Sequence, residues 1–300
     1  MPDEYRKGSA DSKLISFVIV LMIIAALAII VISTGIRNDD GSEEEESGPW
    51  KDLTIMKTTL NGDTYLSYDE IDGPGNLDGV QSPEKSVYML IGIQENLNST
   101  EVVSIGKYLD RGGHVIIADD GTRSERISNY TFGRTGGKVN MLGHRYLVDK
   151  KFTDPDTADG GYDYNLSFIK AQSMKIEGED YLTLVHAPKG MNYTGPGTEL
   201  LTTTKMLTVV DTNDNWQMDL EDIYMQYGTI GVRFEAGDNG GSITFISSTG
   251  LFTDNVFDRY QNGDFLLTYL GSMLPDGGKV LLDQSKQITS YSPHTEVIPV

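Results

Sequence analysis

Cysteine is absent from the 300 residues of the chain, which excludes disulfides, thiolate metal sites and cysteine nucleophiles. Histidine is scarce, and its four copies form neither an HExxH motif nor an i, i+4 pair, which argues against a zinc site on a helix. The chain also lacks a G-x-S-x-G nucleophile elbow, a P-loop and a G-x-G-x-x-G fingerprint. No familiar motif of nucleophilic, zinc or nucleotide chemistry is therefore present.

Basic residues are also few, with 24 Lys and Arg against 44 Asp and Glu, for a formal net charge of -20. Such a surface repels the phosphates of nucleic acids, so we expect no nucleic-acid partner. Carboxylates are so numerous that a glycosidase-like catalytic pair cannot be selected from the sequence. A hydrolase that acts on glycans through two carboxylates remains an alternative function.

One long apolar run stands near the N-terminus, LISFVIVLMIIAALAIIVI at 14–32. As a helix its 19 residues span about 28 Å, close to the thickness of a bilayer core. We therefore predict an uncleaved transmembrane helix over 14–34. The run is longer than the apolar region of a secretory signal peptide, which is about 7–15 residues.

The charges beside this run set its predicted orientation. Arg6, Lys7 and Lys13 precede it, whereas a single Arg37 and then acidic residues follow it. The positive-inside rule places residues 1–13 in the cytoplasm and the rest of the chain outside, as a single-pass protein of the cell membrane.

A second interpretation concerns Arg6-Lys7-Gly8, which resembles the processing site of archaeal type IV pilin-like precursors. Cleavage there would leave Ser9 as the mature N-terminus. A pilin-like surface subunit is therefore a further alternative function.

The remaining chain divides by composition into three parts. Residues 35–49 are polar and rich in Glu and Gly, which is typical of a flexible acidic stalk. Residues 50–286 are long enough for a sizeable core and form the main domain, and 287–300 are a tail.

Two segments of the main domain predict strand–helix–strand units. In the first, the apolar run at 85–93 is a strand, Asn98 and Glu101 have capping-box spacing, and Gly112-Gly113 ends the helix before an apolar strand at 114–118. In the second, 242–247 and 279–283 are strands around a helix at 263–274.

Such units favour parallel strands. The predicted fold class is α/β, a three-layer doubly wound and mainly parallel sheet, preceded by the transmembrane helix. Residues 121–201 are rich in Gly, Tyr, Thr and Asp and are predicted to be an irregular or β-rich insertion.

Polar residues follow the predicted parallel strands, where ligands of α/β folds bind. As a group these residues have the chemistry to bind a small polar ligand or a partner loop, but Asp and Ser after a strand more often cap the next helix or form turns. The candidate ligand-binding residues are Asp119, Asp120, Ser247, Ser248, Thr249 and Asp283.

A candidate calcium loop begins at Asp211. Its oxygen-bearing side chains stand at positions 1, 3, 5, 9 and 12, and the carbonyl of position 7 completes the set, as calcium requires. Position 6 is Trp216 rather than glycine, and position 12 is an Asp rather than a Glu. An Asn/Asp-rich turn without an ion is the alternative. The candidate metal ligands, for structural calcium, are Asp211, Asn213, Asn215, Gln217, Asp219 and Asp222.

Several segments together resemble the domain-of-unknown-function family 4350, an archaeal and bacterial group of membrane proteins. They are DRGGHVIIADDG, DTNDN, ITFISSTGLFTDN, QNGDFLLTYL and PDGGKVLLDQS. The resemblance covers about 85–121 and 209–285. It implies a flavodoxin-like fold akin to that of the class I glutamine amidotransferases. Because those enzymes use a Cys nucleophile, their chemistry does not transfer to a chain without cysteine.

The leading functional hypothesis is therefore a membrane-anchored, extracytoplasmic binding or scaffold domain that is not an enzyme. Its expected partner is an unidentified protein.

Overall fold

The structure is a computed structural model that describes residues 52–119, 121, 123–148, 168–204, 208–215, 218–275 and 277–286. The chain divides into two compact units, Met1–Ser47 and Gly48–Val300, and every described residue belongs to the second. The predicted transmembrane helix, the pilin-like processing site, the stalk and the tail all lie outside the described residues. The description below concerns the second unit alone.

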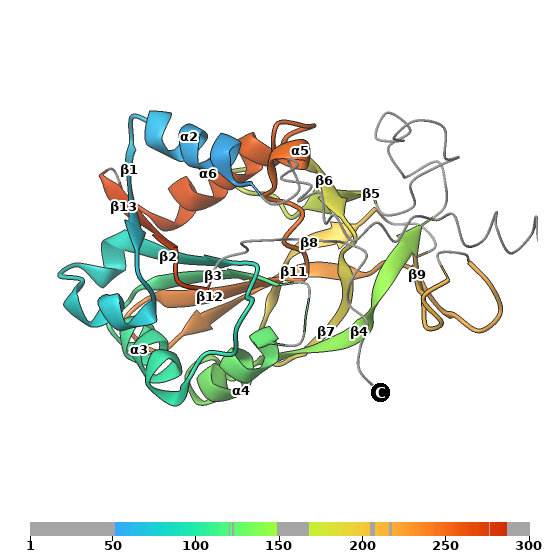
Figure 1. Cartoon of the computed structure of the whole chain (residues 1–300), viewed down its shortest axis with the longest axis horizontal. Coiled ribbons are helices and arrows are strands. Elements are labelled where there is room, and N and C mark those ends of the chain that lie inside the picture. Colours follow the sequence, from blue (N-terminus) through green and yellow to red (C-terminus); the bar gives the residue numbers. More distant parts are fainter. Residues whose placement is uncertain are drawn as a thin grey trace, which may run out of the picture. The chain divides into compact units, whose positions relative to one another are not determined.

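Five neighbouring strands run parallel in the order β1-β13-β2-β3-β12 (Figure 1). Both predicted strand–helix–strand units are confirmed, with boundaries within one or two residues of those expected. The elements of this part are α2 (Thr54–Gly62), β1 (Leu66–Ile71), the 3-10 helices η1 (Pro74–Gly79) and η2 (Pro83–Lys85), β2 (Ser86–Ile91), α3 (Ser99–Asp110), β3 (His114–Ala118), α4 (Arg123–Thr135), β12 (Gly241–Ile246), α5 (Asp254–Phe257), α6 (Asn262–Met273) and β13 (Gly278–Asp283).

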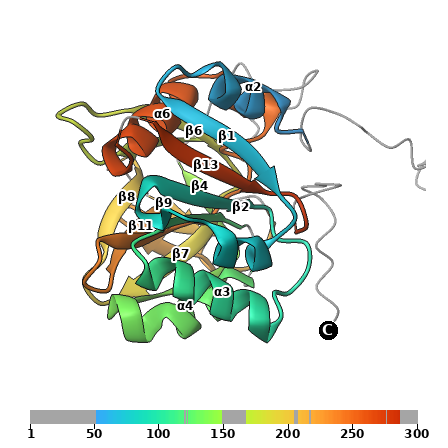
Figure 2. The same ribbon diagram turned by 90° about the vertical axis from the view of Figure 1, so that its left-hand side faces the viewer.

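Helices cover both faces of these parallel strands, α2 and α6 on one face and α3 and α4 on the other (Figure 2). Successive residues of β2 therefore enter different cores: Met89 packs with the α2 and α6 residues, and Tyr88 and Leu90 pack with those of α3. All six residues of β2 are buried, as expected for a strand covered on both sides. Each large apolar side chain so buried contributes about 1.5–3 kcal/mol.

The remaining strands pair antiparallel and extend the sheet beyond β12 through β11, β7, β4, β9 and β10. Strand β8 also pairs with β11, and β5 joins β8 to β6. The elements of this part are β4 (Lys138–Val148), β5 (Phe168–Ser173), β6 (Leu182–His186), β7 (Lys189–Thr194), β8 (Thr198–Thr203), β9 (Thr208–Val210), β10 (Ile223–Met225) and β11 (Thr229–Ala236).

The predicted fold class is wrong. The described residues form one mixed sheet of 13 strands instead of a mainly parallel doubly wound sheet. The physical reason lies in the connections after α4. Strands β4 to β12 follow one another without a crossover helix among the described residues, and parallel pairing needs such a crossover, whereas hairpin-like connections produce antiparallel pairs. The described strands of the region predicted as an irregular or β-rich insertion, β4 to β8, are thus part of the sheet.

The membrane predictions are also corrected. None of the described helices is long and apolar enough to cross a membrane. The longest of them, α4, has 13 residues and spans about 20 Å, against a bilayer core of about 30 Å. Residues 14–34, the predicted span, lie outside the described residues. The transmembrane assignment, and with it a single-pass protein of the cell membrane whose domain faces outward, is therefore not carried further.

Candidate functional site

Two of the predicted ligand-binding groups lie next to each other at the carboxyl ends of the parallel strands. Ala118 of β3 is in register with Ile246 of β12, so Asp119 and Ser247 follow on adjacent strands. Asp283 is the last residue of β13, which is separated from β3 by β2. Asp120 lies outside the described residues.

Asp119 lies where β3 passes into α4. Its side chain is buried, and Oδ2 accepts a hydrogen bond of 3.0 Å from the backbone N–H of Ser124 in the first turn of the helix. Its own N–H donates to the carbonyl of Ile246 at 3.0 Å. A carboxylate at a helix N-terminus satisfies free N–H groups and interacts favourably with the helix dipole. The position therefore has a structural role whether or not a ligand binds.

Asp283 is fully buried and is held from two sides. The hydroxyl of Tyr88 donates to Oδ2 at 2.5 Å, and the backbone N–H groups of Ser285 and Lys286 each donate to Oδ1 at 2.8 Å. Burial, followed by the charge of Asp283, raises the pKa of Tyr88 well above its usual value, so the phenol stays protonated and remains the donor. The carboxylate thus closes the turn after β13.

The hydroxyl residues after β12 are buried as well. Ser248 Oγ donates to the carbonyl of His186 at 2.7 Å. Ser247 Oγ has no hydrogen-bond partner among the described residues, and Thr249 is buried beside them. Ligand binding by this group remains a prediction, and its polar atoms lie inside the fold.

The described histidines do not assemble a metal centre. His114 Nδ1 lies 2.9 Å from Ser242 Oγ inside the domain, and the His186 ring packs against Phe168 with centroids 4.8 Å apart. Within the described ranges, no group of three or more His, Asp or Glu side chains is placed to hold a metal ion.

The predicted calcium loop connects β9 to β10 and folds onto itself. The amides of Asn213 and Asn215 both donate to Asp219 Oδ2, at 3.0 and 2.7 Å. Hydrogen bonds from Asn213, from the backbone of Glu221 and from Asn215 lower the pKa of Asp219. Three of the six predicted ligands therefore converge on one point.

Two further predicted ligands anchor the same loop. Asp211 Oδ1 accepts from the N–H of Asn215 at 3.1 Å. Asp222 accepts from the N–H groups of Thr212 and Asp219 at 3.1 and 2.9 Å. The sixth, Gln217, and the adjacent Trp216 lie outside the described residues.

Positive charge lies close to this loop and would oppose a cation. Arg145 Nε lies 3.5 Å from a carboxylate oxygen of Asp214. Carboxylate and carbonyl oxygens on the loop fit calcium, and an Asn side chain that turns by half a rotation presents its oxygen where its nitrogen was. The donor set is thus compatible with calcium, and the positive charge of Arg145 is the main electrostatic effect that would weaken calcium binding.

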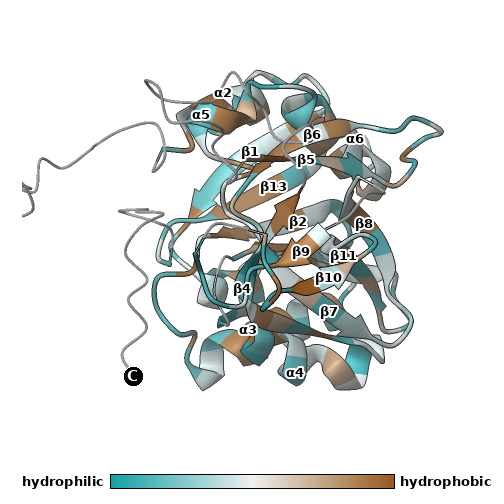
Figure 3. Ribbon diagram, turned by 90° about the vertical axis from the view of Figure 1, so that its right-hand side faces the viewer, coloured by the Kyte–Doolittle hydropathy of each residue, from teal (hydrophilic) through white to brown (hydrophobic). Residues whose placement is uncertain are grey.

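Four large apolar side chains in this loop and directly after it are exposed, and sequence analysis missed them. Leu220 is 99% exposed and Ile223 54% exposed, and the rings of Tyr224 and Tyr227 are exposed too. We call these four residues the hairpin patch. Figure 3 shows β9 and β10 on the side of the domain that faces the viewer. The only sequence signal was the short run IYMQY after the loop, which is too brief to show alternation.

Strand β10 is also an edge of the sheet. It ends the strand order, and among the described strands it pairs with β9 alone. A free strand edge presents N–H and C=O groups that another chain can pair with.

Comparisons with known proteins give only distant similarities. No protein-family model matches the chain, and no curated protein matches it. Among solved structures, the mmIFT52 N-terminal domain aligns with a TM-score of 0.49 and 15% identity over 73% of this chain and 89% of that one. The exo-beta-1,4-mannosidase Op5Man5 from Opitutaceae bacterium strain TAV5 aligns with a TM-score of 0.33 and 11% identity over 66% of this chain and 27% of the enzyme.

A third similarity is to Gan42B, a GH42 beta-galactosidase from G. stearothermophilus, with a TM-score of 0.29, 8% identity, and coverage of 62% of this chain and 20% of the enzyme. Similarities this weak carry no conclusion about fold or function.

Proposed function

We propose that the described domain is a binding or scaffold module that holds a protein partner through the hairpin patch. The observation that carries this proposal is the exposure of four large apolar side chains within eight residues of chain, 220–227, beside a free strand edge. Large apolar side chains that are exposed close together in the chain are a candidate protein–protein contact. A free edge adds backbone hydrogen bonds, as in β-strand addition.

The two described carboxylates among the predicted ligand-binding residues, Asp119 and Asp283, give no support to hydrolysis. A glycosidase needs one carboxylic acid and one carboxylate facing the same bond across an open site. Asp119 and Asp283 are buried and accept hydrogen bonds from the fold itself. The glycan hydrolase and the pilin-like subunit are the two other candidate functions, and no contact among the described residues favours either.

The resemblance to family 4350 also remains a proposal. Its support is the match of the quoted segments to elements of one sheet: DRGGHVIIADDG contains β3, and PDGGKVLLDQS contains β13. The resemblance adds no catalytic residue, so it is compatible with a binding role.

The binding test compares the wild-type chain with the double variant Leu220→Ser, Ile223→Thr. Both positions are exposed, and Thr keeps the β-branched shape that suits a strand. In affinity capture from an extract of the source cells, we expect partners that the wild type retains and the double variant loses. The matched control is Phe132→Ser, which removes a 47% exposed ring from α4 and should retain them. Equal capture by all three chains would contradict the proposal.

We further propose that calcium binds the 211–222 loop and orders the hairpin patch. Support comes from the convergence of Asn213 and Asn215 on Asp219. An ion at this point would tie the loop, which carries Leu220, to β10, which carries Ile223 and Tyr224, and would so act as a structural clip.

Isothermal titration with calcium tests this second step. We expect the wild type to bind and to unfold at higher temperature with millimolar calcium, since a ligand of the folded state stabilises it. Asp219→Asn should lose both effects, and Asp238→Asn, an exposed position on the β11–β12 turn, should keep them. Neither heat nor a thermal shift in the wild type would refute calcium binding without touching the partner proposal.

A further inference from the structure

A buried polar cluster lies between the carboxyl ends of β3 and β12, which are neighbouring parallel strands. After β3 the chain enters α4, on the same face of the sheet as α3, and after β12 it enters α5 and α6, on the opposite face (Figure 2). Neighbouring connections that leave toward opposite faces define a topological switch point, where ligands of open α/β sheets bind. The two strand ends are therefore the position in this fold at which a ligand is expected.

Two side chains of this cluster come from the strands. Asp119 and Ser247 follow directly after the last register pair of β3 and β12. Two residues earlier on each strand, Ile117 and Phe245 belong to the core on the α3 side of the sheet. Because side chains of a strand alternate between faces, Asp119 and Ser247 point to that same side. Neighbouring strands lie about 4.8 Å apart, so the two side chains are next to each other.

The following residue supports this direction for Ser247. Ser248 Oγ donates to the carbonyl of His186 at 2.7 Å. His186 ends β6, which packs on the α6 side of the sheet, since the N–H of Leu184 donates to Asn262 Oδ1 at 2.8 Å. Ser248 therefore points toward α6, and Ser247 points to the opposite face, toward α4.

The third side chain, Ser124, belongs to the first turn of α4. Its backbone N–H donates to Asp119 Oδ2 at 3.0 Å. Ser124 also begins the buried stripe of the helix, which continues with Ile127 and Ser128, so its side chain faces the sheet. It stands at the end of the helix that adjoins the strand ends. The hydroxyl of Ser124 thus lies on the same side as Asp119 and Ser247.

The two serine hydroxyls are buried without a hydrogen-bond partner. Ser124 is 1% exposed and Ser247 0% exposed, and neither Oγ has a partner among the described residues. The hydroxyls of the neighbouring Ser128 and Ser248, by contrast, each form a hydrogen bond with the backbone. Buried polar atoms are nearly always hydrogen-bonded, because an unsatisfied one costs free energy. Two unsatisfied oxygens beside one buried carboxylate therefore point to a ligand that binds oxygen.

We propose that Asp119, Ser124 and Ser247 hold a hard divalent cation of the Mg²⁺ class. Mg²⁺ takes oxygen ligands and is usually held by one or two carboxylates, with water in several of its positions. In P-loop nucleotide hydrolases, Mg²⁺ is held by a Ser or Thr at the start of a helix together with an Asp. The cluster offers the same kinds of donor, with the charge supplied by Asp119 and neutral oxygens by the two serines.

The charges around the cluster permit a cation. The N-terminal end of α4 is the positive end of the helix dipole and opposes one, but the carboxylate of Asp119 lies against it. The guanidinium of Arg123 is turned away, since Nη1 donates to the carbonyl of Ile93 at 3.0 Å. Ile93 follows β2, which lies on the side of β3 away from β12. Arg123 and Gly121 are partly exposed, so the cluster lies close to solvent.

Titration of the full-length chain carrying Asp219→Asn tests the proposal, because this substitution removes the proposed calcium loop as a second site. We expect millimolar Mg²⁺ to raise the unfolding temperature, since a ligand of the folded state stabilises it. Mn²⁺, which suits the same oxygen ligands, should broaden the NMR signals of the Ser124 and Ser247 amides before those of other residues. Absence of a thermal shift, or earlier broadening elsewhere in the chain, would overturn the proposal.

Serine variants in the same background test the two hydroxyls. Ser124→Ala and Ser247→Ala should each weaken Mg²⁺ binding about tenfold or more, as found when groups that support a metal site are removed. Without metal, both should unfold at the temperature of the parent or above it, because each loses an unsatisfied buried hydroxyl. The matched control is Ser104→Ala, at a buried serine of α3, which should bind Mg²⁺ like the parent. Equal affinity in all three variants would refute the site.

A carboxylate variant and two salts exclude other causes of a thermal shift. Asp119→Asn keeps an oxygen that accepts the Ser124 N–H and removes the charge, so it should abolish Mg²⁺ binding. Potassium chloride at the same ionic strength should not reproduce the shift, and an equal effect would mean that general screening of the acidic chain is the cause. Stabilisation by inorganic phosphate instead of Mg²⁺ would show that the helix end binds anions. Either result would overturn the proposal, as would Mg²⁺ binding that persists in Asp119→Asn.

Discussion

His114 lies at the first position of β3 with 6% of its surface exposed, and its Nδ1 is 2.9 Å from Ser242 Oγ. Burial, and to a smaller extent the positive charge of Arg233, lowers the pKa of His114 from 6.5 to about 4. The folded protein therefore resists protonation of this ring, and the unfolded chain does not. Acid should destabilise the domain through this one side chain.

The sign and size follow from proton linkage. Because the folded pKa lies below the unfolded one, the contribution is fully present above pH ~6.5 and is lost as the pH falls toward ~4. The gap between the two pKa values corresponds to about 3 kcal/mol once both states are protonated. Between pH 7 and pH 5 the expected loss in the free energy of unfolding is about 2 kcal/mol.

Urea unfolding of the wild type and of His114→Gln at both pH values measures this loss. Glutamine cannot take up a proton, so the variant should lose about 2 kcal/mol less between pH 7 and pH 5 than the wild type does. The comparison cancels the carboxylates and the other histidines, which titrate in both proteins. It also cancels the cost of the changed hydrogen bond to Ser242, which is present at both pH values.

Equal losses in the two proteins would refute the reasoning. That result would mean that the folded state accommodates a charged His114, through water or a local opening, and that the strand end is less tightly buried than the structure describes.

Three further predictions concern stability. Tyr88→Phe should lower the free energy of unfolding by about 2 kcal/mol in urea titrations, because it removes the charge-assisted hydrogen bond to Asp283; no change would show that the bond contributes little. Asn98→Ala should lower the free energy of unfolding by about 1 kcal/mol, since it removes half of the capping box of α3. An unchanged urea midpoint would contradict this. Gly241→Ala should lower the free energy of unfolding by about 1–3 kcal/mol, because the added Cβ would lie 2.6 Å from the carbonyl oxygen of Leu109. The control is Gly62→Ala, whose Cβ meets nothing within 4 Å and which should not destabilise the domain.

The first strand–helix–strand unit was predictable because its determinants are local. Asn98 accepts from the N–H of Glu101, three residues away, and Glu101 accepts from the N–H of Asn98 in return. Gly112 adopts a φ of 90°, which is available to glycine at no steric cost. Because these contacts join residues that are close together in the chain, the local sequence is sufficient to predict them.

The partners of the later strands were not predictable in this way. Strand β4 lies between β7 and β9, and β11 contacts β12, β7 and β8. Each choice depends on register and on which faces are already covered, and a run of alternating residues does not specify its neighbour. The prediction of the fold class was wrong for this reason.

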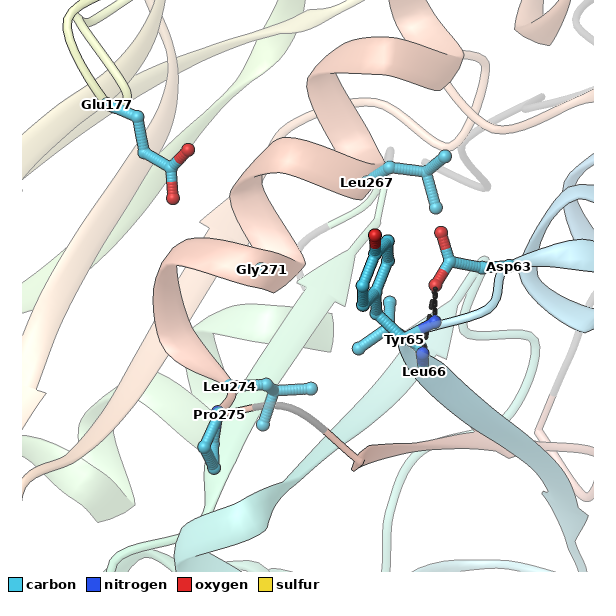
Figure 4. A pocket seen from close by; sticks show the side chains of 8 residues that line it. All are labelled: Asp63, Tyr65, Leu66, Glu177, Leu267, Gly271, Leu274 and Pro275. Atoms are coloured by element: carbon cyan, nitrogen blue, oxygen red, sulfur yellow. Dashed lines mark hydrogen bonds between the residues drawn. The ribbon is translucent and has the colours of Figure 1, made fainter.

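The candidate sites show the same difference between local and long-range contacts. The loop that starts at Asp211 was recognised from residue spacing, and the structure brings Asn213, Asn215 and Asp219 together. A groove over α6 that Asp63, Glu177 and Gly271 line (Figure 4) was not recognised, because these three residues are about a hundred residues apart from one another in the chain.

By itself, then, the sequence determined the excess of negative charge, the exclusion of cysteine chemistry and the local helix and strand boundaries. Composition and contacts within a few residues are sufficient for these. Only the tertiary structure decided that Asp119 and Asp283 are buried, that β10 pairs with β9 alone among the described strands, and that Asp63, Glu177 and Gly271 line one groove. Those properties depend on which distant segments meet, and that is decided when the whole sheet and its helices pack together.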